Sequence, residues 1–195
     1  EGAVLLAQEP PVQAAAFHVG GSVWSTMLER SFHWSLFEPF VEVAVPDPAS
    51  RQRFYALSQL YWDPVDPASW ADRLREKSYL LQIAVGDEQV PNLTSEVWAR
   101  SSGLPVLGPT VNVPPGVEVV EAPLPPGSSA MVQFNPELTV PEESNRPAPL
   151  TGAHEAPRQW EGALLQVLDH FALGSEGQVI HHCGDEPCSA SNQGG

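Results

Sequence analysis

The sequence predicts an α/β fold in which a mostly parallel sheet is flanked by helices. One apolar run, Tyr79–Val85, is nearly continuous and is bounded by Lys77–Ser78 and Gly86–Asp87, which is typical of a central strand of a parallel sheet. From about Pro157 to Leu173, apolar residues recur at spacings of three and four, which predicts an amphipathic helix. Segments of these two kinds alternate along the chain, as they do in α/β proteins.

The chain is acidic, since its 195 residues include 24 Asp and Glu against 9 Lys and Arg, for a formal net charge of −15. Lys77 is the single lysine and no basic run occurs. Nucleic-acid binding is therefore excluded and binding to anionic membranes is disfavoured, because both need clustered cations. The longest apolar stretches fall far short of the roughly 20 residues of a membrane-spanning helix, so we expect no transmembrane segment. Hydrophobic residues make up 42% of the chain, enough for one core of ordinary size.

The first segments predict a helix and then a strand. An apolar helix is expected over Gly2–Gln8, ended by Pro10–Pro11, because proline lacks the amide that a continuing helix needs. The short apolar run at 13–21 is closed by Gly20–Gly21. This run predicts a strand that is buried on both faces and ends in a tight turn.

Helical segments lie on both sides of the strand at 79–85. Residues 22–77 are helical in pattern and rich in aromatic residues, and the prolines at 46–48 and 63–67 divide them into three helical pieces. After the strand, a helix is expected with Pro91 in its first turn and Gly103 at its end.

The remainder of the chain is rich in proline and then helical. Residues 104–150 contain short β-like pieces at 105–113, 117–121 and 130–134. They predict an excursion that includes one further sheet strand, for which the run SAMVQF at 129–134 is favoured. The helix that begins near Pro157 is expected to end at Gly174. A polar tail, 175–195, carries both cysteines.

Two polar side chains follow predicted strands. Asp87 lies in the turn 86–91, at the carboxyl end of a strand, where ligands and catalytic groups of parallel sheets gather. Alternatively, Asp87 or Glu88 only caps the helix that follows by accepting its free amides. His154 lies in the loop 151–157 before the last helix. It can act as a general base if a carboxylate holds its other ring nitrogen, or it is simply a solvated loop residue.

An Asp after one strand and a His after the next resemble the last two members of the Ser…Asp…His order of the α/β-hydrolase superfamily. The chain resembles in particular the large secreted lipase-like hydrolases of Gram-negative bacteria. Residues 18–21 match a V-G-G-like turn of these proteins. Residues 24–31 match their W-S-T-L-like segment and the R-S pair that follows it. Their strand and turn of the form L-L-Q-x-A-x-G-D-x-Q-V-P-N match Leu80–Asn92. The resemblance covers most of the chain, with a weak match over 104–150.

The resemblance implies a carboxylic ester hydrolase of the lipase or esterase type, which acts on a small-molecule or lipid ester and needs no cofactor or metal. It implies that Asp87 and His154 are the acid and the base of a catalytic triad. The family's nucleophilic serine lies in a Gly-x-Ser-x-Gly elbow, which does not occur here; Gly20-Gly21-Ser22 comes nearest but lacks the last glycine. We therefore expect the serine upstream of Glu1, in an N-terminal half of the same polypeptide. Residues 1–174 are then the C-terminal half of the hydrolase domain, inactive alone.

The helical segment 22–77 lies where such enzymes carry a cap over the substrate pocket. Helical apolar stripes are usually ordinary core, but here they could also line an apolar acyl-binding site. The residues that could do so are Trp24, Met27, Phe32 and Trp34. The alternative to an enzyme is a non-catalytic, secreted surface or interaction module that has kept the sheet and lost the chemistry. The two hypotheses differ in whether the predicted acid and base meet.

The two cysteines, Cys183 and Cys188, lie in one short stretch beside His181 and His182. Together these four residues could form a zinc site, since His and Cys are the usual ligands of zinc. A local disulfide is favoured because the cysteine count is even, and because acidity and a near absence of lysine fit an exported protein. We accordingly expect the protein to be secreted or held in the cell envelope.

Two other histidines fall on predicted elements. His170, on the last helix, faces away from the apolar stripe of Leu164 and Phe171, so we expect it to be solvated. His18 lies inside the first predicted strand, so we expect it in the core or near the site.

Overall fold

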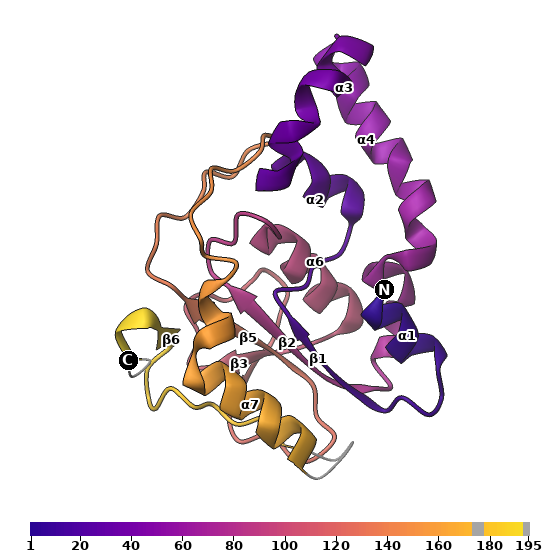
Figure 1. Ribbon diagram of the computed structural model, residues 1–195. Coiled ribbons are helices and arrows are strands. Elements are labelled where there is room, and N and C mark those ends of the chain that lie inside the picture. The colour runs from indigo at the N-terminus through magenta and orange to yellow at the C-terminus, as the bar shows by residue number, and fades with distance from the viewer. Residues whose placement is uncertain (173–177, 193–195) are drawn as a thin grey trace.

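The computed structural model describes residues 1–172 and 178–192 (Figure 1). Within this part of the chain, six strands form one sheet in which every strand pair is parallel. Helices lie on both sides of this sheet, so the predicted α/β class is confirmed. In their order across the sheet the strands are β1 (Ala14–His18), β2 (Ser78–Ala84), β5 (Ala130–Asn135), β3 (Val106–Gly108) and β4 (Val119–Glu121), and β6 (Cys188–Ser189) pairs with β5.

β2 is the central strand that the apolar run predicts, and each of its residues is buried. Successive side chains of a strand point to opposite faces of the sheet. Tyr79 therefore packs with α1 (Gly2–Gln8) and α6 (Asn92–Ser102), whereas Leu80 packs on the other side with Ala163 of α7 (Glu161–Ala172). Figure 1 shows α6 and α7 on opposite sides of the sheet. Burial on both faces explains why the apolar run is continuous rather than alternating.

β1 is a strand, as predicted, but the prediction that both of its faces are buried is wrong. All five residues of Ala14–His18 are only half-buried. β1 pairs with β2 along one edge, and within residues 1–172 and 178–192 no strand pairs with its other edge. A strand at the end of a sheet keeps part of its surface exposed, which the sequence of a single strand does not reveal.

The helical segment 22–77 is divided where the prolines predict. Asp47 caps the longest helix by accepting the backbone N–H of Ser50 at 2.8 Å, and this helix ends before Asp63. The piece before it is not one helix, because the chain is extended at Ser31. The helices are α2 (Trp24–Arg30), α3 (Glu38–Ala44), α4 (Pro48–Trp62) and α5 (Ala71–Leu74), with a 3₁₀ turn at Phe32–Leu36. In Figure 1, α3 and α4 project away from the sheet as a helical hairpin.

The region after β2 contains more sheet than predicted. α6 begins at Asn92, directly after Pro91, and ends at Gly103, whose φ of +65° is the left-handed conformation expected there. The run at 129–134 forms β5, and the β-like pieces at 105–113 and 117–121 contain β3 and β4, which also join the sheet, so the expectation of a single sheet strand in 104–150 is wrong. These two strands have three residues each and lie among prolines, so their local pattern does not indicate that they pair in the sheet.

α7 forms where the spacing predicts but turns a different face to the sheet. His170 is fully buried, so the prediction that it is solvated is wrong. Leu164 and Leu168 are 52% and 65% exposed. A polar contact explains this orientation. Gln82 of β2 donates to the Oε1 of Gln166 at 3.0 Å, and this bond holds the Gln166 face of the helix against the sheet. The predicted helix end at Leu173 and Gly174 lies outside the described residues.

Candidate active site

The structure brings Asp87 and His154 together at one edge of the sheet. Asp87 follows β2 after Gly86, whose φ of +78° turns the chain out of the strand. His154 follows β5 in the chain, and β5 pairs with β2. Because the carboxyl ends of parallel strands meet at the same edge, side chains that follow them lie close together.

The two side chains form a buried hydrogen-bonded pair. Nδ1 of His154 lies 2.9 Å from Oδ2 and 3.0 Å from Oδ1 of Asp87. Asp87 is 4% and His154 7% exposed. The Oδ1 atom also accepts the backbone N–H groups of Gln89 at 2.8 Å and Val90 at 2.7 Å. Asp87 therefore caps the turn and holds the imidazole at the same time.

These contacts determine the tautomer of the imidazole. An ionised carboxylate only accepts hydrogen bonds, so Nδ1 of His154 carries the proton and Nε2 is left with its lone pair. Nε2 faces the Nη2 atom of Arg158 at 3.1 Å, and a guanidinium only donates. Arg158 is also paired with Glu155 at 3.0 Å. His154 thus presents an accepting nitrogen toward a half-exposed arginine.

Glu88 is a part of this site that the sequence indicated only as a possible helix cap. It is fully buried, and its carboxylate accepts three hydrogen bonds from the segment 151–154. Burial raises the pKa of Glu88, but the bonds from its own amide, Thr151, His154 and Gly152 outweigh it and hold the pKa below the ordinary range. Glu88 is therefore an anion at neutral pH.

His18 lies near the pair, at the end of β1. Its Nδ1 contacts Oε1 of Gln82 at 2.8 Å. Burial lowers its pKa, the bond to Gln82 opposes this, and the nearby Arg158 and His154 lower it further. A mostly apolar pocket of about 480 Å³ adjoins these residues and is lined by Ala16, His18, Gln82, Arg158, Ala163, Leu164, Val167 and Leu168.

A second pocket, of about 270 Å³, is lined by Asp87. It is enclosed by the turn that carries Asp87, by α6 and by residues 140–148. Its lining includes Arg30, Pro91 and Asn145. Asp87 therefore lines a hollow that is flanked by charged side chains.

The serine nearest to a glycine-rich turn does not reach His154. Ser22, after Gly20-Gly21, is 1% exposed and its Oγ donates to the backbone oxygen of Thr94 at 2.9 Å. This bond gives Ser22 a structural role between the end of β1 and α6.

The four aromatic and sulfur-containing residues predicted for an acyl site lie in the helical segment. Trp24 stacks on Trp62 with ring centroids 5.5 Å apart. The indole N–H of Trp34 donates to the hydroxyl of Tyr55 at 2.9 Å. Phe32 connects the segment to the site, because its backbone N–H donates to the backbone oxygen of Glu88 at 2.7 Å. Met27 is half-buried in α2. Trp24 and Trp34 are half-buried and contact side chains of the same helical segment.

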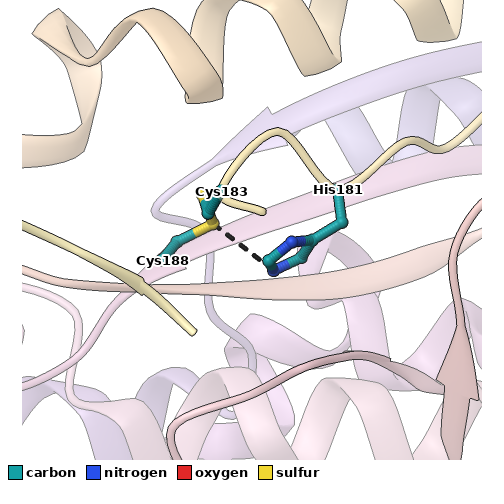
Figure 2. A group of neighbouring side chains, drawn as sticks. All are labelled: His181, Cys183 and Cys188. Atoms are coloured by element: carbon teal, nitrogen blue, oxygen red, sulfur yellow. Dashed lines mark hydrogen bonds between the residues drawn. A yellow bond between two sulfur atoms is a disulfide. The ribbon is translucent and has the colours of Figure 1, made fainter. Parts of the chain in front are cut away.

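The two cysteines form the disulfide that the sequence favours, and Figure 2 shows His181 beside it. Nε2 of His181 lies 3.5 Å from Sγ of Cys188. Zinc binds thiolates, and both sulfur atoms are joined in the S–S bond, so the disulfide excludes the alternative of a zinc site in this form of the protein. Burial lowers the pKa of His181, although backbone groups of Gly184 and Pro109 oppose the shift.

Comparison of the chain with protein-family models, with curated proteins and with solved structures found no match. Among the described helices, none combines the length and the apolar character needed to cross a bilayer. The function is accordingly inferred from the side chains themselves and from the resemblance in the sequence.

Proposed function

We propose that this chain carries the acid and the base of a serine hydrolase that cleaves carboxylic esters. The observation that supports the proposal most is the buried contact of His154 Nδ1 with Asp87, which leaves Nε2 as the accepting nitrogen. A base of this kind takes the proton of a nucleophilic hydroxyl. The position of the pair at the carboxyl ends of β2 and β5 also agrees with the sequence resemblance to α/β-hydrolases.

In the proposed reaction a serine hydroxyl attacks the ester carbonyl and His154 takes its proton at Nε2. His154 then returns the proton to the leaving alcohol, and a water molecule releases the acyl group in the same way. Asp87 keeps Nδ1 protonated and stabilises the imidazolium that forms. This chemistry uses no cofactor.

We propose that the serine lies upstream of Glu1, on an N-terminal half of the same polypeptide. The sequence contains no Gly-x-Ser-x-Gly elbow, and Ser22 is buried and bonded to Thr94. Half-buried residues of β1 and exposed leucines of α7 line the apolar pocket together with Arg158, which contacts His154. A strand and a helix from another segment could cover these surfaces and bring a serine to Nε2. The substrate is a small-molecule or lipid ester.

We also propose that the protein acts outside the cytoplasm, in the secreted fraction or the cell envelope. The supporting observation is the Cys183–Cys188 disulfide, which persists in oxidising compartments.

Ester hydrolysis by the polypeptide from the complete open reading frame tests the proposal, with p-nitrophenyl butyrate as the substrate. His154→Gln removes the base and Asp87→Asn favours the wrong tautomer, so each is expected to lower kcat/KM by about 10³–10⁴-fold. His182→Gln is the matched control, because His182 pairs with Asp169 at 2.5 Å, in a different part of the molecule, and should leave the rate unchanged.

The coding sequence upstream of Glu1 gives an independent check. A Gly-x-Ser-x-Gly sequence is expected there, within some tens of residues. If no such serine is encoded, and the two site variants hydrolyse the ester as the unmodified protein does, the hydrolase proposal is wrong. The non-catalytic surface or interaction module then becomes the better hypothesis.

A further inference from the structure

We propose that Glu88 is a positioning residue that fixes the main chain around His154 and thereby aims its imidazole at Asp87. The inference rests on the proposed function for its catalytic meaning. The hydrogen bonds of Glu88 that support it do not depend on the proposed function. Asp87 holds the ring of His154, and the next residue in the chain holds its backbone.

Glu88 binds three donors within four consecutive residues. Its Oε2 atom accepts the hydroxyl of Thr151 at 2.9 Å and the backbone N–H of His154 at 3.3 Å. Its Oε1 atom accepts the backbone N–H of Gly152 at 3.3 Å. Gly152 has a φ of +87°, a backbone conformation that residues other than glycine rarely adopt. The loop before His154 is thus folded around one carboxylate.

Glu88 is itself held in place on both sides. Its backbone oxygen accepts the N–H of Phe32 at 2.7 Å, which ties it to the helical segment. The preceding residue, Asp87, is held by the amides of Gln89 and Val90. The turn that follows β2 therefore carries two fixed carboxylates. The distance between them sets where the backbone and the ring of His154 lie relative to each other.

The burial of Glu88 makes its bonds to the loop costly to lose. A buried carboxylate is costly unless hydrogen bonds or a cation compensate for the lost water. In the described part of the chain no ion pair joins Glu88 to an Arg, Lys or His side chain, so donors from Thr151, Gly152 and His154 compensate its charge. Hydrogen bonds to an ionised acceptor are roughly twice as strong as neutral ones.

Amide exchange and nitrogen-edited NMR on the protein from the complete open reading frame test the inference, with ¹⁵N-labelled histidine, glycine, glutamine and valine. Glu88→Gln replaces an acceptor oxygen with a donor that faces the loop amides. We expect exchange of the Gly152 and His154 amides to speed up by about tenfold or more. We also expect loss of the downfield Nδ1–H signal of His154. The amides of Gln89 and Val90, which Asp87 holds, should keep their protection.

A pair of Thr151 variants provides a milder test if Glu88→Gln does not fold. Thr151→Val removes the hydroxyl that donates a hydrogen bond to Glu88, whereas Thr151→Ser keeps it. Only Thr151→Val should speed up exchange in the loop, and Glu161→Gln, which removes an exposed carboxylate in the first turn of α7, should change nothing.

The inference is wrong if Glu88→Gln folds and keeps both the loop protection and the Nδ1–H signal, or if the two Thr151 variants behave alike. Ester hydrolysis separates this result from a failure of the proposed function. If the protein is active, Glu88→Gln should lower kcat with little change in KM. If the protein is inactive, the hydrolase proposal fails, and the exchange measurements still decide the role of Glu88.

Discussion

Arg158 lies where the hydroxyl of a nucleophile would meet His154. Its Nη2 atom is 3.1 Å from Nε2 of His154, so the lone pair that a general base uses already accepts a hydrogen bond. The ion pair that holds Arg158 to Glu155 is about half-exposed, with side-chain exposures of 46% and 55%, and such pairs contribute little stability. The guanidinium can therefore move aside at small cost and leave Nε2 to another partner.

This contact predicts that Arg158 limits chemical access to His154. Diethyl pyrocarbonate acylates the unprotonated nitrogen of an imidazole, and the 9% exposed side chain of His154 is reached past Arg158. Arg158→Ala should raise the rate of acylation of His154 several-fold, measured by mass spectrometry of the peptide that contains residue 154. Arg100→Ala, which removes a guanidinium on α6, is the control and should leave the rate unchanged. An equal rate in both variants would contradict the prediction.

The sequence could place Asp87 and His154 but not the residues that hold them. Both follow strands, and the strand pattern and the turn signals are local. The partners of Glu88 are 63 to 66 positions away, and no local pattern encodes such a distance. Arg158 was also missed, because the sequence predicts His154 in a loop before the helix that begins near Pro157, so no helical spacing joins the two residues. The catalytic roles of Asp87 and His154 stay a prediction.

At the scale of elements, the spacing of apolar residues predicts that α7 is a helix but not which of its faces contacts the sheet. This spacing predicts a helix from about Pro157 to Leu173; α7 forms over Glu161–Ala172, after a 3₁₀ turn at Ala156–Gln159. Its orientation depends on the surface below it, where Gln82 of β2 is 1% exposed and needs polar partners. Gln166 supplies one and the backbone oxygen of Ala163 another, at 2.8 Å. The hydrogen bonds of the buried Gln82 amide, rather than the larger apolar stripe, thus decide which face of α7 contacts the sheet.

The orientation of α7 predicts that a polar residue of this helix contributes more to the free energy of unfolding than a leucine does. Gln166→Ala leaves the backbone oxygen of Ile180 and one donor of Gln82 without their partner and opens a cavity, so it should lower the free energy of unfolding by about 2–3 kcal/mol. Leu168→Ala, at a position 65% exposed, should change it by less than about 0.5 kcal/mol. Urea unfolding of both variants measures the difference. The reverse order would show that the leucine stripe faces the sheet.

The strands were predictable in proportion to their length and burial. β2 and β5 have seven and six residues and lie in the middle of the sheet, so their apolar runs are distinct. β3 and β4 have three residues each; the sequence shows β-like pieces there, but their place in the sheet is evident only from their pairing. For β1 the element was predictable, but its place at the edge of the sheet depends on strand order, which is a property of the whole fold.

At the scale of the whole molecule, three histidines in separate regions have a lowered pKa; His170 is buried, and His18 and His181 are half-buried. His18 in β1, His170 in α7 and His181 beside the disulfide each have a pKa lowered by burial from the ordinary histidine value. Gln82 opposes the shift of His18, and nearby backbone groups oppose the other two. In the unfolded chain these histidines have ordinary pKa values near 6.5. The unfolded state therefore binds protons first as the pH falls.

This difference predicts that the fold loses stability between about pH 7.5 and 5.5, a window in which ordinary carboxylates stay ionised. A histidine whose folded pKa is lowered stabilises the fold above its unfolded pKa, and that contribution is lost as the pH falls. His170→Gln removes the most deeply buried of the three, so the loss of stability across the window should be smaller than in the unmodified protein. Urea midpoints at both pH values measure it. His33→Gln, at an exposed position, should keep the original pH dependence, and an equal dependence in His170→Gln would contradict the prediction.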